Sequence, residues 1–359
     1  MDNFTPAPQY VRELHRIISR LLYLILFLVL VIIAMPLLFL YGDRLSKWMT
    51  TAPQQLPQTP MSIRTGSSQN EPANSGSLFW SPPETSTIVD ADLLKKVEYG
   101  KKLIQHTSVY LGPKGSVAQI SNGMNCQNCH LDAGTRVFGN NYGSVASTYP
   151  KFRARSGSTE DIYKRVNDCF ERSLNGKALD TQSAEMQAIR SYIEFIGSNV
   201  PKGTKAEGSG LKDLAFLDRA ADPALGKKVY DQKCVSCHQP NGAGTLLADG
   251  NEYVYPPLWG PASYNDAAGL FRLSNFARYV KYNMPLGATY ENPQLTDEEA
   301  WDVAAYINSQ KRPHKKTPLD WPDISKKPVD HPFGPYKDSF SEVQHKFGPF
   351  KPIQEFYKK

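Results

Sequence analysis

The sequence predicts an all-α fold in which two tandem helical units follow one N-terminal transmembrane helix. An apolar run of 21 residues without a charge lies near the N-terminus, at Leu21–Tyr41. Two later segments of the chain carry the same landmarks in the same order, which indicates an internal duplication. The apolar fraction of 40% and the net charge of +6 suit small packed cores. They exclude a polytopic membrane protein, an acidic disordered chain, a collagen and a coiled coil.

The apolar run is long enough to cross a bilayer, because a helix of this length spans about 30 Å. The apolar region of a signal peptide is usually about 7–15 residues, and no convincing cleavage site follows here, so an uncleaved anchor is favoured. We therefore expect a cytoplasmic stretch at 1–20 and a single-pass anchor at 21–41. Residues 42–88, rich in Pro, Gln, Ser and Thr, are typical of a flexible linker. The basic residues on the two sides are too evenly divided to set the orientation.

Each duplicated unit contains an opening helix, a Cys-x-x-Cys-His motif, an aromatic segment with proline and a closing helix. We expect the first unit to occupy 89–212 and the second 213–312, with an extended tail at 313–359 that wraps the surface. The predicted opening and closing helices are Tyr99–Thr107 with Glu185–Gly197, and Leu225–Lys233 with Glu298–Gln310.

The two Cys-x-x-Cys-His motifs predict covalent attachment of two haem c groups. Thiols one helical turn apart can form thioethers with both vinyl groups of one haem, and the adjacent histidine then ligates the iron. A zinc knuckle would need further Cys or His residues at ligand spacing, and none follows either motif. A thioredoxin-like redox Cys-x-x-Cys would need a single motif in a βαβ context, whereas this chain has two motifs in duplicated helical units. The predicted residues are Cys126, Cys129 and His130 for the first haem, and Cys234, Cys237 and His238 for the second.

With these motifs, the sequence predicts that the two helical units are tandem class I cytochrome c-like domains. Covalent haem attachment together with the anchor indicates that the protein lies in the bacterial inner membrane, with both domains on the periplasmic side. No interleaved pattern of basic and aromatic residues suggests a nucleic acid partner.

The distal iron ligands differ between the units. In the second unit, Met284 precedes a proline just before the closing helix, where small class I cytochromes place a methionine ligand; the alternative is a methionine that fills the core. The corresponding loop of the first unit has neither a Met-Pro pair nor a histidine. Its candidates are Cys169, Met186 and Lys164. Met186 falls within the closing helix, and a lone cysteine is more often a buried structural thiol.

The residues around Cys169 predict a helix over 159–174, with Ser158 as its N-cap and acidic residues in its first turn. Arg165, Cys169 and Ser173 are four residues apart in turn, so they share one face of that helix. An arginine one turn from a cysteine stabilises a thiolate.

Further arginines surround this predicted helix. Arg153 and Arg155 enter it from the preceding loop, and Arg172 lies near its end. Several guanidinium groups near a thiolate form a pocket for a dianionic oxyanion. The alternative is that these arginines bind the haem propionates, a role that suits Arg153 and Arg172 better than Arg165.

With these residues, the chain resembles the di-haem thiosulfate dehydrogenases, which are tetrathionate-forming c-type cytochromes, over about residues 90–350. The resemblance implies a catalytic haem with His/Cys ligation, so that His130 and Cys169 would be its axial ligands. It also implies that Arg155, Arg165 and Ser173 form the substrate pocket.

Two features depart from this family. Some members use a lysine just before the methionine as a distal ligand of the electron-transfer haem, whereas this chain has Asn283 there, so Met284 is the natural ligand. Many relatives are soluble periplasmic proteins, whereas this chain has a predicted anchor.

The resemblance implies that the protein oxidises two thiosulfate ions to tetrathionate, a reaction that can also run as tetrathionate reduction. Cys169 would act as iron ligand and nucleophile, through a cysteine-bound thiosulfonate. Electrons would pass from the first haem to the second, and on to a downstream cytochrome or a terminal oxidase. One alternative is a membrane-tethered di-haem electron carrier without its own substrate, serving a respiratory complex. Another is a subunit of a sulfur-oxidising carrier system.

Overall fold

The computed structural model describes residues 20–26, 28–29 and 79–358. Contacts divide the chain into two units, 1–73 and 74–359, and every element below belongs to the second. Most of the predicted cytoplasmic stretch, the predicted anchor and residues 42–78 of the predicted linker lie outside the described residues. In the part that is described, no helix combines the length and the apolar character needed to cross a membrane.

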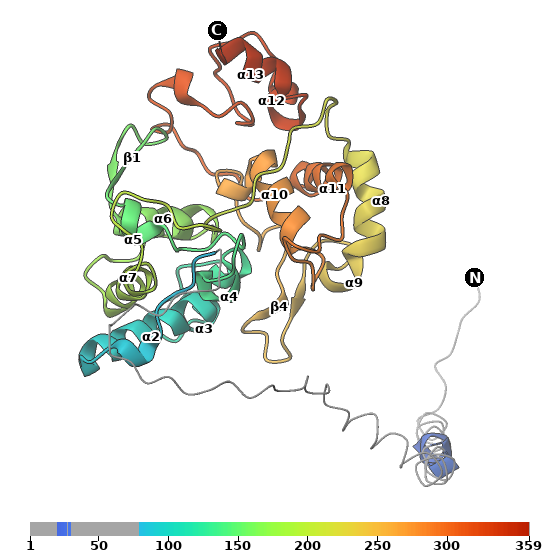
Figure 1. Cartoon of the computed structure of the whole chain (residues 1–359). Coiled ribbons are helices and arrows are strands. Elements are labelled where there is room, and N and C mark those ends of the chain that lie inside the picture. The colour runs from blue at the N-terminus through green and yellow to red at the C-terminus, as the bar shows by residue number, and fades with distance from the viewer. Residues whose placement is uncertain (1–19, 27, 30–78, 359) are drawn as a thin grey trace, which may run out of the picture. The chain divides into compact units, whose positions relative to one another are not determined.

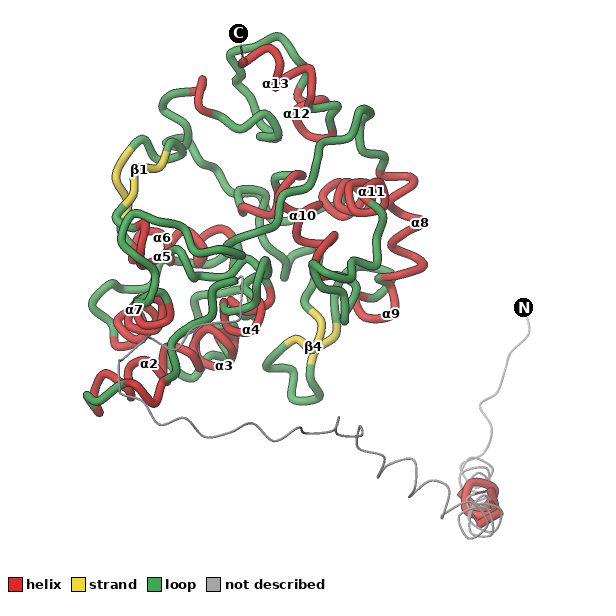
Figure 2. Tube along the Cα trace, in the orientation of Figure 1, coloured by secondary structure: helices red, strands yellow, loops and turns green. Residues whose placement is uncertain are grey.

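The second unit consists of helices joined by long loops, and its strands form two small hairpins (Figures 1 and 2). The first domain and the stretch leading into it contain η1 (Thr85–Thr87), α2 (Ala91–Gln105), α3 (Thr107–Leu111), η2 (Cys126–Asn128), α4 (Leu131–Gly134), α5 (Val145–Thr148), β1 (Lys151–Arg153), β2 (Ser158–Glu160), α6 (Ile162–Arg172) and α7 (Ala184–Ile196). The second domain contains α8 (Pro223–Lys233), α9 (Val235–His238), β3 (Thr245–Leu246), β4 (Tyr253–Tyr255), η3 (Gly269–Phe271), α10 (Leu273–Asn283) and α11 (Asp297–Ser309). The C-terminal segment, residues 313–359, contains η4 (Ile324–Lys326), α12 (Glu342–Phe347) and α13 (Lys351–Lys358).

The opening and closing helices of each domain pack against each other, α2 against α7 and α8 against α11 (Figure 1). A glycine lies at the same place in both crossings. A Cβ atom on Gly100 would overlap the backbone carbonyl of Ala188, and one on Gly226 would overlap that of Asp302. The shared Gly-Lys-Lys sequence therefore marks the point where two helices approach most closely, in both domains.

Replacement of Gly226 by alanine should destabilise the second domain by about 3 kcal/mol, because the added methyl group meets backbone and forces α8 away from α11. Chemical denaturation of the holoprotein measures this change. Gly269→Ala is the matched control, since a Cβ there meets no described atom within 4 Å. Equal losses of stability in the two variants would contradict the close helix crossing.

The helix around Cys169 begins later than the sequence predicts. Ser158–Glu160 forms β2 and pairs antiparallel with Lys151–Arg153, so the helix starts at Ile162 rather than at 159. Asp161, not Ser158, is the N-cap, and its side chain accepts a hydrogen bond from the Lys164 amide. The strand partner upstream was not visible in the local sequence pattern, which explains the error. The two hairpins are also additions to the predicted all-α fold.

The predicted linker extends too far toward the first domain. Residues 79–88 lie against that domain, with Trp80 packed on its core. The Trp80 indole donates a hydrogen bond to Asn199, and the Trp80 amide donates one to the Glu207 carbonyl. An indole can bury a large apolar surface while its N–H keeps a partner, which makes Trp80 an effective anchor.

The C-terminal segment is more folded than the predicted extended tail. Its last part forms α12 and α13, and Phe350 and Ile353 are buried in the core of the second domain. Its middle is held by Asp330, whose side chain is 1% exposed and accepts hydrogen bonds from Arg272 and Ser274. The tail therefore does wrap the surface, but it also completes the second core.

Asp330 should make stability depend on pH in the acid range. Burial alone would raise the pKa of this carboxyl, but Arg272 and Ser274 outweigh burial and hold the pKa below its usual value. A depressed pKa contributes stability above the unfolded value of about 3.9, and this contribution is lost as pH falls through the folded pKa. We expect Asp330→Asn to cost about 3 kcal/mol at pH 7, a difference that narrows below about pH 4. Melting curves of both proteins from pH 7 to 3 test this, and a difference that is constant with pH would contradict it.

Candidate functional site

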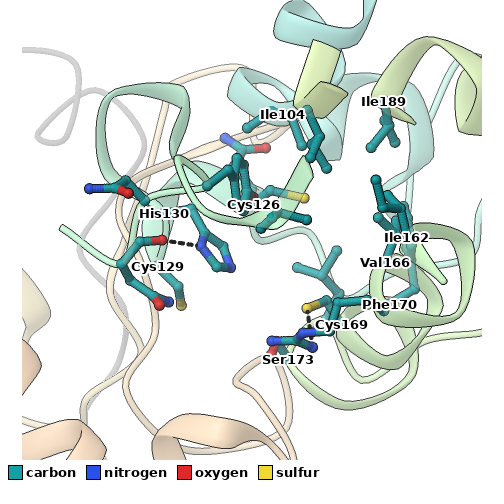
Figure 3. A pocket seen from close by; sticks show the side chains of 18 of the residues that line it. Ile104, Cys126, Cys129, His130, Ile162, Val166, Cys169, Phe170, Ser173 and Ile189 are labelled. Carbon is teal, nitrogen blue, oxygen red and sulfur yellow. Dashed lines mark hydrogen bonds between the residues drawn. The ribbon is translucent and has the colours of Figure 1, made fainter. Parts of the chain in front are cut away.

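A cavity that is partly open to solvent lies in the first domain between the first Cys-x-x-Cys-His motif, α6 and α7 (Figure 3). Cys126, Cys129 and His130 line it from one side, and Cys169 and Ser173 line it from α6. Most of the remaining lining is apolar, with side chains such as Ile104, Ile162, Val166, Phe170 and Ile189. The fold thus brings the predicted attachment and distal residues of the first haem to one pocket.

The two predicted proximal histidines have the same environment. The His130 Nδ1 atom lies 2.5 Å from the Asn140 carbonyl oxygen, and the His238 Nδ1 atom lies 2.9 Å from that of Pro256. A carbonyl at Nδ1 fixes the proton there and leaves Nε2 free to ligate a metal. Burial lowers the pKa of His130 to about 4 and also lowers that of His238, so both rings are neutral, as a ligand must be. Two thiols and such an imidazole facing one apolar cavity fit haem c.

Cys169 faces His130 across the first cavity, as Figure 3 shows. The Arg165 Nη1 group lies 3.2 Å from the Cys169 sulfur and donates a hydrogen bond to it. The electrostatic interaction with Cys169 raises the pKa of Arg165 more than burial lowers it. Ser173, the C-cap of α6, lines the same pocket one turn further along.

The other two candidates for the distal ligand of the first haem do not line this cavity. Met186 is fully buried in the core of the first domain. Lys164 points to Asp168, with its Nζ atom 2.6 Å from the carboxylate. Among the described residues, Cys169 is therefore the candidate that the structure brings to the pocket, and its ligation of iron stays a prediction.

Arg155 is not among the residues that line the first cavity. Its Nη2 group lies 2.6 Å from Asp168, the residue next to Cys169, and the Asp168 side chain is 1% exposed. Burial, together with the charge of Arg172, lowers the pKa of Arg155. The sequence analysis missed Asp168, although its spacing of four residues from both Lys164 and Arg172 on one helix was a readable signal.

The two arginines considered for the haem propionates also have other partners. The Arg153 Nε atom is 4.0 Å from Glu160, within the β1–β2 hairpin. Arg172 forms a bidentate ion pair with Asp320 of the C-terminal segment, at 2.7 and 2.8 Å. Neither lines the first cavity.

A second cavity, also partly open to solvent, is lined by the residues predicted for the second haem. Cys234, Cys237, His238 and Met284 all line it, and Met284 is the C-cap of α10. The cavity is also lined by Cys129 of the first motif, which lines the first cavity as well. The two haem pockets therefore share a wall.

Several contacts between the domains lie on the loop that carries the first motif. The Tyr279 hydroxyl on α10 donates to the Asn128 carbonyl at 2.7 Å, inside the motif. Glu252, between β3 and β4, accepts a hydrogen bond from the side-chain Nδ2 group of Asn125 at 2.9 Å and pairs with His106 at 3.0 Å. These residues were not predicted, since nothing in the local sequence indicates which residues meet across a domain boundary.

Family models match both domains. The model described as SoxA/TsdA, cytochrome c domain, matches residues 116–201, and the model described as cytochrome c matches residues 223–311. The protein is therefore a c-type cytochrome with two haem domains, and it carries two covalently bound haem c groups, as the motifs predict.

Several whole proteins are similar to this chain. The thiosulfate dehydrogenase of Psychrobacter arcticus is 37% identical over 67% of this chain and 71% of that protein. The thiosulfate dehydrogenase of Allochromatium vinosum is 35% identical over 64% of this chain and 83% of that protein. This chain belongs to the thiosulfate dehydrogenase family, which confirms the resemblance seen in the sequence.

A solved structure is also similar, that of thiosulfate dehydrogenase (TsdBA) from Marichromatium purpuratum in its as-isolated form. The two chains are 32% identical and superpose with a TM-score of 0.61. The match covers 66% of this chain and half of that chain.

Proposed function

We propose that this protein oxidises two thiosulfate ions to tetrathionate and transfers the two electrons released to its haem groups. The observation that carries this proposal is the pair formed by Cys169 and Arg165, 3.2 Å apart in the pocket that also contains His130. Membership in the thiosulfate dehydrogenase family supports the same substrate.

Cys169 can perform the sulfur chemistry through a bond to substrate. Its thiolate and the outer sulfur of one thiosulfate form a sulfur–sulfur bond while two electrons leave, which gives a cysteine-bound thiosulfonate. A second thiosulfate then attacks the substrate sulfur of that bond, tetrathionate departs, and the Cys169 thiolate is regenerated. Every step can run backwards, so the same residue serves tetrathionate reduction.

The positive residues near Cys169 have an electrostatic role in this scheme. Two dianions and a thiolate repel one another strongly, and the repulsion is largest in a pocket with an apolar lining. Arg165 can offset it at the reacting sulfur, and Ser173 can donate a hydrogen bond to a sulfonate oxygen. We assign Arg155 to the substrate as well: its side chain does not line the pocket, but its contact with Asp168, the residue next to Cys169, holds its positive charge near the reacting sulfur.

When bound, a haem in each of the two adjacent pockets would accept one electron. Cys126, Cys129 and His130 would hold the first haem, and Cys234, Cys237, His238 and Met284 would hold the second, so the chain could store both electrons of one turnover. A downstream cytochrome or terminal oxidase would receive them.

We further propose that the protein is anchored in the bacterial inner membrane through Leu21–Tyr41, with both haem domains in the periplasm. The uncharged length of this run supports the anchor. Fractionation of cells that express the full chain, or a chain lacking 21–41, tests it: recovery of both forms from the soluble periplasmic fraction would contradict the anchor.

Assay of the purified holoprotein in both directions tests the activity. We expect thiosulfate to reduce an artificial acceptor with formation of tetrathionate, and tetrathionate to oxidise the reduced protein. A holoprotein with both haems that does neither would contradict the proposal and would favour an electron carrier without its own substrate.

A further inference from the structure

The C-terminal segment reaches the arginines beside the first haem pocket through two adjacent residues. Both carboxylate oxygens of Asp320 accept hydrogen bonds from Arg172, at 2.7 and 2.8 Å. The Trp321 amide donates to the Arg155 carbonyl at 2.6 Å. The segment therefore holds the side chain of one arginine and the backbone of another.

These contacts belong to a larger network centred on Asp168. This carboxylate accepts hydrogen bonds from Arg155 and Lys164, each at 2.6 Å, and the Arg172 Nε atom lies 3.7 Å away. Three cationic side chains, those of Arg155, Lys164 and Arg172, thus share the carboxylates of Asp168 and Asp320. The network has a net charge of about one positive unit. Asp168 is next to Cys169 in the chain, so this charge lies beside the proposed reaction centre.

Asp320 determines how the cations divide between the two carboxylates. With Asp320 in place, Arg172 directs its two Nη groups to the C-terminal segment, and the closest contacts of Asp168 go to Arg155 and Lys164. Without it, Arg172 has Asp168 as its remaining carboxylate in the network and competes there with Arg155. The loop that carries Arg155 would also lose its neighbour Trp321 as a fixed anchor.

We infer that Asp168 and Asp320 are positioning residues for Arg155, and that the C-terminal segment is therefore part of the substrate site. The inference rests on the proposed function, because it assigns Arg155 to the sulfur oxyanion. The segment is itself fixed on the second domain, through Asp330 with Arg272 and through the buried Ile353. The second domain thus helps to place an arginine that acts in the first.

Asp320→Asn tests this inference because it removes the charge and keeps the shape. We expect KM for thiosulfate to rise about tenfold, as for the loss of one charge-assisted hydrogen bond, with kcat within about twofold. Asp320→Glu retains the charge and should recover most of the wild-type KM. The matched control is Asp323→Asn in the same segment, whose carboxylate contacts Ser325 and Lys326 and should leave KM unchanged.

A binding measurement separates this inference from the proposed function. Titration calorimetry with thiosulfate in a Cys169→Ala background, where turnover is absent, should give a dissociation constant about tenfold weaker when Asp320→Asn is added. Limited proteolysis and melting curves show whether the segment stays folded. Equal dissociation constants with and without Asp320, or a KM change in Asp323→Asn of the same size, would overturn the positioning role. Absence of thiosulfate turnover in the unaltered protein would instead overturn the proposed function.

Discussion

A holoprotein in which alanine replaces Cys169 is expected to lose thiosulfate-dependent electron transfer by at least about 1,000-fold. The proposed scheme forms and breaks its sulfur–sulfur bond at this side chain, and alanine has no atom that can do so. Cys169 also faces His130 across the pocket, so its loss should change the electron paramagnetic resonance signal of the first haem while that of the second stays the same. Steady-state kinetics and the spectra of the oxidised protein measure both effects.

Met186→Leu is the matched control for this experiment. Met186 was the other sulfur-containing candidate for the first distal ligand, and it lies in the core, outside the pocket lining. Leucine conserves its volume, so turnover and both haem signals should be retained. If Cys169→Ala kept wild-type turnover, or if Met186→Leu altered the signal of the first haem, the assignment of Cys169 would be wrong.

The sequence was sufficient to predict the parts of the fold that occur in both domains. Gly100 and Gly226 occupy the same place in two Gly-Lys-Lys segments, and both lie where an opening helix crosses a closing one. The haem residues were also predictable, because Cys-x-x-Cys-His is a local pattern whose chemistry requires its spacing. The helical face that joins Arg165 and Cys169 was predicted for the same reason, since residues four apart meet on a helix.

The sequence was not sufficient to predict contacts between residues that are far apart along the chain. Arg155 was expected beside Cys169, but its side chain pairs with Asp168, and its backbone is held by Trp321 from the far end of the chain. The start of α6 was misplaced because β2 finds its partner in β1, a pairing that competes with helix formation. Trp80 and Ile353 were placed in flexible or extended segments because their burial depends on surfaces formed elsewhere.

Arg165 gives the second large expected effect. Replacement by glutamine should lower kcat/KM for thiosulfate by about 100- to 1,000-fold, in the range seen when one donor to a developing negative charge is removed. Arg165 donates directly to the Cys169 sulfur and lies in a pocket with little polar lining, where its charge is poorly screened. The loss should appear in kcat as well as in KM, because repulsion grows as the second dianion approaches.

Two further variants determine whether charge or geometry is responsible. Arg165→Lys keeps the positive charge but loses the planar fork that binds two oxygens, so it should recover only part of the activity. Arg190→Gln is the control for a lost arginine: Arg190 lies on α7, pairs with Glu194 and Tyr163, and does not line the pocket. Full recovery by lysine would mean that charge alone suffices. A loss in Arg190→Gln as large as that in Arg165→Gln would mean that net charge, rather than contact with Cys169, governs the reaction.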